Sequence, residues 1–322
     1  MATYKEIQGT AVQNYAGDPA NPIVGQVWYD VAASVFQYRA EAAAGAWSTG
    51  GDMNNEKNFG GGTGTATAAL AFGGPSTGVN TETYNGSNWT EVNNMNTARD
   101  HFGSAGIQTS ALAFGGEPPP SPGTAETESW NGTNWTEVND LNTARRRLMG
   151  AGATNTAALG FGGYDPGDLA LTETWNGTNW TEVNDLNTAR RSGAGVGTNT
   201  AALIVGGEEP RASDGVLTEI WNGTNWTEVN DLNTARNALS ATSLSYTNAL
   251  AFGGETPPST AVTESWNGSN WTEVGDLNTA RNGLAGAGAN NTSALAFGGN
   301  PSGAATEEFN SPAFINETIT TS

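Results

Sequence analysis

The sequence predicts an all-β fold built from repeated four-stranded antiparallel sheets, and three observations carry this prediction. The segment WNGTNWTEVNDLNTAR occurs three times without change, at 130–145, 175–190 and 221–236, and near copies occupy 84–99 and 266–281. An apolar run that ends in Gly-Gly recurs six times. No stretch shows a sustained 3.6-residue apolar period, so we expect little helix.

The repeat has the length of one blade of a β-propeller. An NTAR sequence ends each segment, and successive arginines are separated by 46, 45, 46 and 45 residues. A period near 45 residues holds about four short strands with their turns. Because the Gly-Gly marker occurs six times, we predict a six-bladed propeller over 47–322. The arginines are Arg99, Arg145, Arg190, Arg236 and Arg281.

One period, from 146 to 190, shows the four predicted strands in order. Strand A is MGAGAT (149–154), whose small residues suit the crowded centre where blades converge. Strand B is AALGFGG (157–163), an apolar run typical of a strand covered on both faces. Strands C and D are LTETW and NWTEV, and the Asn-Gly between them is a strong hairpin signal.

The paired tryptophans of each hairpin explain why the sequence repeats. With a loop of either two or four residues, both indoles project from the same face of the sheet. Burying one indole contributes about 4–6 kcal/mol as an upper bound, and a neighbouring copy of the sheet can supply the cover. We therefore assign a packing role between blades to Trp47, Trp89, Trp130, Trp135, Trp175, Trp180, Trp221, Trp226, Trp266 and Trp271.

The sixth hairpin is irregular, which leaves two ways to complete the last blade. TEEF (306–309) resembles strand C, but the residues after it lack the second Trp. WSTGGDMNNEK (47–57) aligns without gaps to WTEVNDLNTAR, so we predict that the strand around Trp47 completes this blade. The rival strand is the C-terminal FINETITT. Residues 1–46 differ in composition and predict a separate attachment module, with an extended arm and a β-hairpin over 21–41.

The repeat resembles the kelch-type β-propeller repeat over about residues 47–309. The shared features are Gly-Gly at the end of strand B, a variable loop, two spaced aromatic residues and a Thr-Glu-Val strand. The chain departs from typical kelch repeats in one respect, because its aromatic pair lies closer together, five residues apart. Copper-dependent kelch-type oxidases need a Cys ligand, and this chain has none, so we carry no such activity over.

The N-terminal module carries a second resemblance. Asn-Pro-x-x-Gly-Gln-x-Trp-Tyr (21–29), followed by a short strand and Trp-containing repeats, resembles virion structural or tail-fibre-like proteins of tailed phages, notably marine cyanophages. This resemblance implies a phage particle as the location, assembly in the host cytoplasm, and other virion proteins as partners of residues 1–46. Phage fibres are commonly trimers, so the resemblance makes a trimer one possible oligomer, but the sequence contains no heptads and does not fix the stoichiometry.

Composition excludes several classes of function. The formal net charge of −20 disfavours nucleic acid and anionic membranes as partners. No run of apolar residues is long enough for a transmembrane helix, and the N-terminus lacks the features of a signal peptide. The chain has no Cys and one His, His101, which we interpret as a turn or surface residue. We therefore expect no metal and no cofactor.

Enzymatic activity is not expected. Neighbouring glutamates such as Glu307 and Glu308 are in principle able to serve glycoside hydrolysis, but on a strand we expect them to be solvated.

The repeated arginines, with Lys57 in the sixth equivalent position, are predicted to form a ring, and their role has two interpretations. They either clamp neighbouring blades by pairing with an acidic residue such as Asp140, or bind an anionic sugar at the mouth of the channel. The B–C loops, which differ in every copy, should emerge on the same face as these cations. We therefore name Tyr164, Asp165, Arg211 and Asp214 as candidate binding residues.

Taken together, the sequence predicts a non-enzymatic virion structural or appendage protein that is attached through its N-terminal module. Its propeller would serve interaction with a host-surface glycan or with a protein. The alternative is a glycan- or protein-binding propeller that is not part of a virion, and an enzyme acting on glycans is a third reading.

Overall fold

The computed structural model describes residues 12–17, 19, 26–39, 45–74, 78–119, 123–208, 215–311 and 316–319. Within these ranges the chain forms strands and turns and contains no helix, so the all-β prediction is confirmed. Accordingly, no helix of the described residues is long and apolar enough to span a bilayer. The chain divides into two compact units, Ala46–Asn310 on one side and Met1–Gly45 with Ser311–Ser322 on the other.

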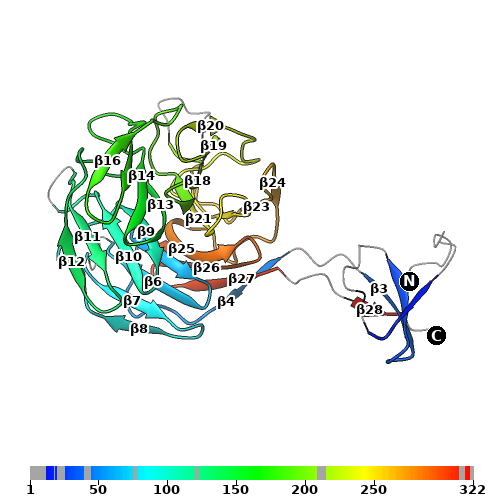
Figure 1. Ribbon diagram of the computed structural model, residues 1–322. Helices are drawn as coiled ribbons and strands as arrows, with labels where there is room; N and C mark the ends of the chain where they lie inside the picture. The colour runs from blue at the N-terminus through cyan, green and yellow to red at the C-terminus, as the bar shows by residue number, and fades with distance from the viewer. Residues whose placement is uncertain are drawn as a thin grey trace. The chain divides into compact units, whose positions relative to one another are not determined.

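The larger unit contains six four-stranded antiparallel sheets among its described residues (Figure 1). The first holds β5 (Gly61–Thr65), β6 (Ala68–Phe72), β7 (Thr81–Tyr84) and β8 (Trp89–Val92). The second holds β9 (Gly103–Ile107), β10 (Ser110–Phe114), β11 (Thr127–Trp130) and β12 (Trp135–Val138). The third holds β13 (Met149–Thr154), β14 (Ala157–Phe161), β15 (Thr172–Trp175) and β16 (Trp180–Val183).

The remaining three sheets repeat this order. The fourth holds β17 (Ala194–Thr198), β18 (Ala201–Val205), β19 (Thr218–Trp221) and β20 (Trp226–Glu228). The fifth holds β21 (Ser240–Thr242), β22 (Leu250–Phe252), β23 (Thr263–Trp266) and β24 (Trp271–Glu273). The sixth holds β25 (Asn282–Asn290), β26 (Ser293–Asn300), β27 (Thr306–Asn310) and β4 (Ala46–Thr49).

The register within each sheet follows the predicted parse. In the third sheet, β13 to β16 fall on the four segments assigned to strands A to D. In the second sheet, Trp130 lies directly opposite Trp135, with ring centroids 5.5 Å apart, so the four-residue loop is the correct alternative. Asn131 closes this loop, because its side-chain oxygen accepts hydrogen bonds from the N–H groups of Thr133 and Asn134.

The strand around Trp47 completes the last sheet, as predicted. β4 pairs antiparallel with β27, and Trp47 lies opposite Phe309, in the position that the second Trp of the hairpin occupies in the other sheets. The rival strand has a different place: β28 (Asn316–Thr318) pairs with β3 (Val35–Arg39) of the smaller unit. The predicted boundary at 322 therefore shifts, because Ser311–Ser322 belong with Met1–Gly45.

The smaller unit has its own four-stranded sheet. Its strands follow the order β1 (Gln13–Tyr15), β2 (Val27–Asp30), β3 and β28. β2 and β3 form the predicted hairpin, and β1 pairs with β2 in parallel. The only described residues of the GDPANP segment are Gly17 and Pro19, so the predicted extended arm lies mostly outside the described residues.

The core of the larger unit lies between neighbouring sheets. Between the third and fourth sheets, Phe161 packs edge-on against Trp226 at 5.0 Å, and both are buried. All ten tryptophans assigned to packing are buried. The first strands approach one another so closely that a Cβ added to Gly150 would meet the Ser104 carbonyl oxygen at 2.4 Å, which explains the Gly-rich sequence there.

Candidate functional site

Buried cations connect each sheet to the next. Arg99 from the connection after β8 pairs with Glu128 of β11 at 2.9 Å, and Arg281 pairs with Glu307 of β27 at 2.8 Å. Lys57 occupies the sixth equivalent position, with its Nζ 3.9 Å from Glu82. We call these cations the clamp residues. They are Lys57, Arg99, Arg145, Arg190, Arg236 and Arg281, and their partners are Glu82, Glu128, Glu173, Glu219, Glu264 and Glu307.

The clamp of Arg236 is embedded in a set of hydrogen bonds. Arg236 is 1% exposed, pairs with Glu264 at 3.2 Å and also donates to the carbonyl oxygens of Val262 and Ala251. Glu264 in turn accepts hydrogen bonds from the backbone and side-chain nitrogens of Asn233 at 2.8 and 2.7 Å. Burial lowers the pKa of Arg236 to about 10 despite the nearby carboxylate.

Lys57 differs from the five arginines in its chemistry. Its ammonium is buried, donates to the Asn80 carbonyl oxygen at 2.9 Å and lies near Glu82, which is itself fully buried. Burial lowers the pKa of Lys57 to about 8, because desolvation of the ammonium outweighs the attraction of Glu82. The lowered pKa brings the titration of Lys57 closer to neutral pH than that of a free lysine.

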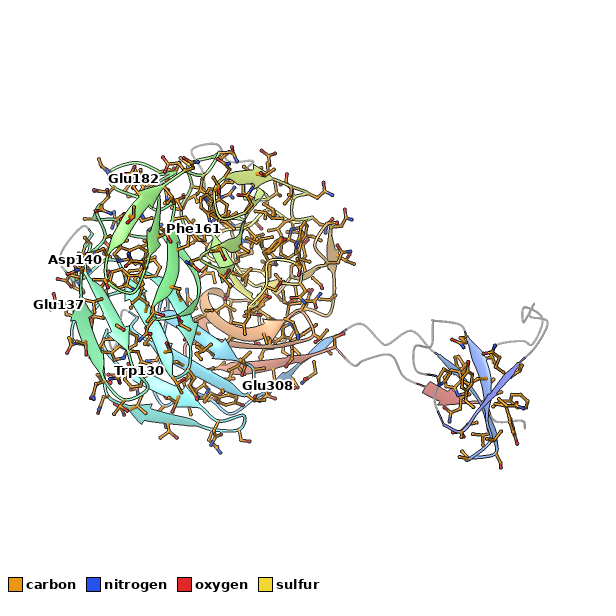
Figure 2. The ribbon with its side chains drawn as sticks, in the orientation of Figure 1. Trp130, Glu137, Asp140, Phe161, Glu182 and Glu308 are labelled. Atoms are coloured by element: carbon orange, nitrogen blue, oxygen red, sulfur yellow. The ribbon has the colours of Figure 1, made fainter. Side chains whose placement is uncertain are left out.

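The structure corrects two expectations about charged residues. Asp140 was expected to pair with the arginines, but it lies exposed at the outer edge (Figure 2) and accepts a hydrogen bond from the Thr127 backbone N–H. The partner is a glutamate of strand C in the next sheet. Glu307 was expected to be solvated, but it is such a partner and is 4% exposed. The clamp interpretation thus fits the arginines, whose guanidinium groups face protein rather than solvent.

The second tryptophan of each hairpin makes a further contact between sheets. Its indole N–H donates to the hydroxyl of the first Thr of strand C in the preceding sheet, at 3.0–3.1 Å. The pairs are Trp135–Thr81, Trp180–Thr127, Trp226–Thr172, Trp271–Thr218, Trp47–Thr263 and Trp89–Thr306. A buried indole N–H is thereby satisfied at every interface.

Six residues, each placed two positions after a clamp residue, are linked to one another by backbone hydrogen bonds. All have a positive φ, between 50° and 61°. Each donates its backbone N–H to the carbonyl oxygen of the one before it, at 2.6–3.0 Å, and Phe59 donates to Gly283, so the bonds form a cycle. We call them the rim residues: Phe59, His101, Arg147, Ser192, Ala238 and Gly283.

The rim residues differ in every copy, although the segments before them are nearly identical. Together with the residues that follow them, they line a cavity of about 110 Å³, which we call the mouth cavity. His101, expected at a turn or surface, is a half-buried rim residue whose ring stacks on Phe59 at 4.1 Å. Five of the six rim residues are not glycine, although their positive φ favours glycine. Backbone strain of this kind is commonly found at functional sites.

A second pocket, of about 190 Å³, shares Arg147 with the mouth cavity. We call it the basic pocket, and it is lined by Arg146, Arg147, Tyr164 and Arg191. Arg146 and Arg191 lie over the ring of Tyr164, at 5.3 and 4.9 Å from its centroid. Tyr164 was a predicted candidate. The three arginines were missed, although the sequence held a signal: cations outside the clamp positions are rare in this chain.

The other predicted binding residues divide into two groups. Asp165 is exposed in the same B–C loop as Tyr164, and its N–H donates to the Gly167 carbonyl oxygen at 3.0 Å. Arg211 and Asp214 lie outside the described residues. We predicted that the B–C loops and the connections after strand D lie on the same face. The backbone bridge between Arg146 of such a connection and Tyr164 of a B–C loop agrees with this prediction.

One cluster near the rim has the composition of a metal site. Asp100, His101 and Glu117 place one ligand atom each within 4.8 Å of one another. The carboxylate of Glu117 also pairs with Arg146, and Asp100 contacts His101 Nδ1 at 2.8 Å. The cation already held by Glu117 opposes a second one, so this cluster is a weak candidate for a metal.

A scan against protein-family models and a search of curated protein sequences each find no match to this chain.

Proposed function

We propose that residues 46–310 form a closed six-bladed β-propeller of the kelch type. The first strands of the sheets support this proposal by their order of contact, in which β5, β9, β13, β17, β21 and β25 each touch the next and β25 touches β5. Three further sets of contacts follow the same order: the clamps, the Trp–Thr hydrogen bonds and the rim. Each set also joins the last sheet, or the connection that follows it, to the first sheet or its neighbouring connection: Lys57 pairs with Glu82, Trp89 donates to Thr306 and Phe59 donates to Gly283.

The proposed kelch relationship is supported by local geometry. Both glycines of each Gly-Gly marker have a positive φ, for example 63° and 112° at Gly162 and Gly163. A side chain would be strained there, and a Cβ on Gly162 would meet the Arg190 carbonyl oxygen at 2.5 Å. The marker therefore serves the close approach of strand B to the next clamp, which gives it a physical role in every blade.

We propose further that the protein is a non-enzymatic virion structural or appendage protein of a tailed phage. In this proposal the smaller unit attaches the protein to other virion proteins, and the propeller presents one face to a host-surface glycan or protein. The observation that carries the display role is the contrast between a nearly invariant frame and a variable face. Clamps, tryptophans and hairpins repeat, whereas the rim residues and the B–C loops differ in each copy.

The two units also suit separate attachment and display. The smaller one contains its own sheet, and the strand β28 joins it from the far end of the sequence. Both ends of the chain thus leave the propeller next to each other, through β4 and β27, which are paired strands.

Mass spectrometry of density-purified particles tests the virion role. We expect peptides of this protein to co-purify with the major capsid protein at a constant ratio across the particle band. Recovery only in the soluble fraction of lysed cells would overturn the virion role.

The alternative, a glycan- or protein-binding propeller outside a virion, is favoured by the basic pocket. A glycan array probed with the full chain addresses it: specific binding combined with absence from particles would support the alternative.

A further inference from the structure

Among the described residues of the larger unit, the cations outside the clamps are gathered at one place. Residues 46–310 contain ten Lys or Arg, of which six are the clamp residues. The other four are Arg146, Arg147, Arg191 and Arg211, and the first three line one pocket. In a chain with a formal net charge of −20, the basic pocket is therefore the place where the described residues offer guanidinium groups outside the clamps.

Comparison of the copies shows how the pocket arises. The residue after Gly-Gly is glutamate in three copies, at Glu117, Glu208 and Glu255, and it forms a backbone bridge with the residue that follows a clamp arginine. In the third sheet this position is Tyr164, so Arg146 faces an aromatic ring where its register partner would otherwise be a carboxylate. The substitution removes one negative charge from the place where two arginines meet.

Carboxylates hold two of the guanidinium groups in position without enclosing them. Arg191 pairs with Asp168 and with Glu208, and Arg146 pairs with Glu117 of the preceding sheet. These arginine side chains remain 20–25% exposed. A guanidinium has five N–H donors, so each retains donors that can face a ligand.

Arg147 is the least engaged of the three. Its guanidinium approaches Glu208 only at 3.9 Å, beyond hydrogen-bond distance, and its side chain is 36% exposed. Its backbone is held at a φ of 55° by the cycle of rim hydrogen bonds. Arg147 lines both the mouth cavity and the basic pocket, so the rim fixes a cation at the junction of the two.

We propose that the basic pocket binds an oxyanion carried on a saccharide, a carboxylate or a sulfate ester. Arg147 and Arg146 would contact the oxyanion, since guanidinium forks match its oxygens, and Arg191 would position the ring of Tyr164. A volume of about 190 Å³ suits a single charged group with part of its sugar ring and is smaller than a typical drug-sized site. This inference rests on the proposed recognition function and names its ligand class.

Other copies of the repeat show which residues these positions tolerate. Ala238 and Ser192 occupy the position of Arg147 in other copies, so Arg147→Ala has a precedent at the same positive φ. Asn237 and Asn282 occupy the position of Arg146, so Arg146→Asn has one too. Arg39→Gln removes the same charge from the smaller unit and serves as the control.

The test is an NMR titration of the arginine Nε–Hε signals of the full chain at constant ionic strength. The probes are sodium glucuronate, glucose 6-sulfate and glucose. We expect saturable shifts with one or both anions, a Kd about tenfold weaker in Arg147→Ala and Arg146→Asn, and an unchanged Kd in Arg39→Gln. A preference for glucuronate identifies a carboxylate as the ligand group, and a preference for the sulfate identifies a sulfate ester.

Three results would overturn the proposal: no saturable shift with either anion, equal binding of glucose, or the same Kd in the pocket variants as in the wild type. These outcomes are separable from the virion role. A protein that is present in particles but does not bind the anions would refute the pocket alone. A protein that binds them but is absent from particles would refute the virion role and leave the pocket standing.

Discussion

Removing one partner of a buried clamp should destabilise the larger unit strongly. In Glu264→Gln, Arg236 stays buried at 1% exposure and loses its only carboxylate within 3.2 Å among the described residues. An uncompensated buried charge costs about 3–5 kcal/mol, which for a unit of this size lowers the Tm by roughly 6–20 °C. Arg236→Met should cost a similar amount, because it leaves the Glu264 carboxylate without its cation.

A double-mutant cycle separates the pair from its surroundings. The free energy of unfolding is measured by urea titration followed by tryptophan fluorescence, since ten of the eleven tryptophans lie in the larger unit. The double variant Arg236→Met/Glu264→Gln should cost less than the two single changes together, by at least about 2 kcal/mol. Glu273, which lies opposite Glu264 in the register and is exposed, provides the control Glu273→Gln, expected within about 0.5 kcal/mol of wild type.

Two results would refute the reasoning. The first is a loss below about 1 kcal/mol in Glu264→Gln, which would mean that water reaches the guanidinium and replaces the carboxylate. The second is additivity of the two single changes within about 0.5 kcal/mol, which would mean that the two groups do not interact.

Three further predictions concern Lys57, the indole hydrogen bonds and the hairpin glycines. The folded-state pKa of Lys57 is lowered to about 8 from an ordinary 10.5, so the unfolded chain binds more protons between these pH values. The free energy of unfolding of wild type relative to Lys57→Met, measured by urea titration, should therefore rise with pH across this window, and a difference that stays flat would contradict the lowered pKa. Thr127→Val should lower the free energy of unfolding by about 1–3 kcal/mol, since the buried Trp180 N–H loses its acceptor at 3.1 Å. The double variant Trp180→Phe/Thr127→Val should lower it by less than the two single changes together, and equal stability of Thr127→Val and wild type would exclude the bond. Gly177→Ala, at a φ of 90°, should lower the Tm, while Gly167→Ala in open space should leave it unchanged or raise it, and the reverse order would show that the hairpin geometry is wrong.

Features encoded within one repeat were predictable from the sequence. Strands A to D follow from apolar runs, Gly-Gly and Asn-Gly, and the third sheet has its strands on the predicted segments. The strand around Trp47 was found because its sequence aligns with the other copies, and β4 indeed pairs with β27. In each case the signal is local or is repeated.

Features that depend on which residues meet across sheets were not predictable in the same way. Asp140 and Glu128 are both acidic and close in sequence to the hairpin, and only the packing of strand C against the connection that precedes its sheet selects Glu128 as the partner of Arg99. The alternation of strand C contained a usable sign, because Glu128 follows a buried Thr in a strand covered on both faces. A charge at such a position requires a buried partner.

The rim and the basic pocket were missed for another reason. Positive φ at Arg147 or Ala238 has no marker in the residue type, since neither is a glycine. The cycle of rim hydrogen bonds joins residues from six different connections, which are far apart in the sequence. The cations of the basic pocket, in contrast, can be recognised in the sequence once the clamp residues are assigned, because few other Lys or Arg residues remain.

Closure of the ring is tested most directly by a disulfide across the seam where β4 meets β27. Ser48 lies opposite Glu308 in this pair, and the chain has no cysteine of its own, so Ser48→Cys/Glu308→Cys provides a unique pair. Thr83→Cys/Thr90→Cys, at the same register position of the first sheet, is the positive control. Under mild oxidation of the folded full chain, a closed ring predicts an intramolecular disulfide in both variants, detected by mass spectrometry of the peptides. A disulfide in the control but free thiols at 48 and 308 would contradict a closed ring.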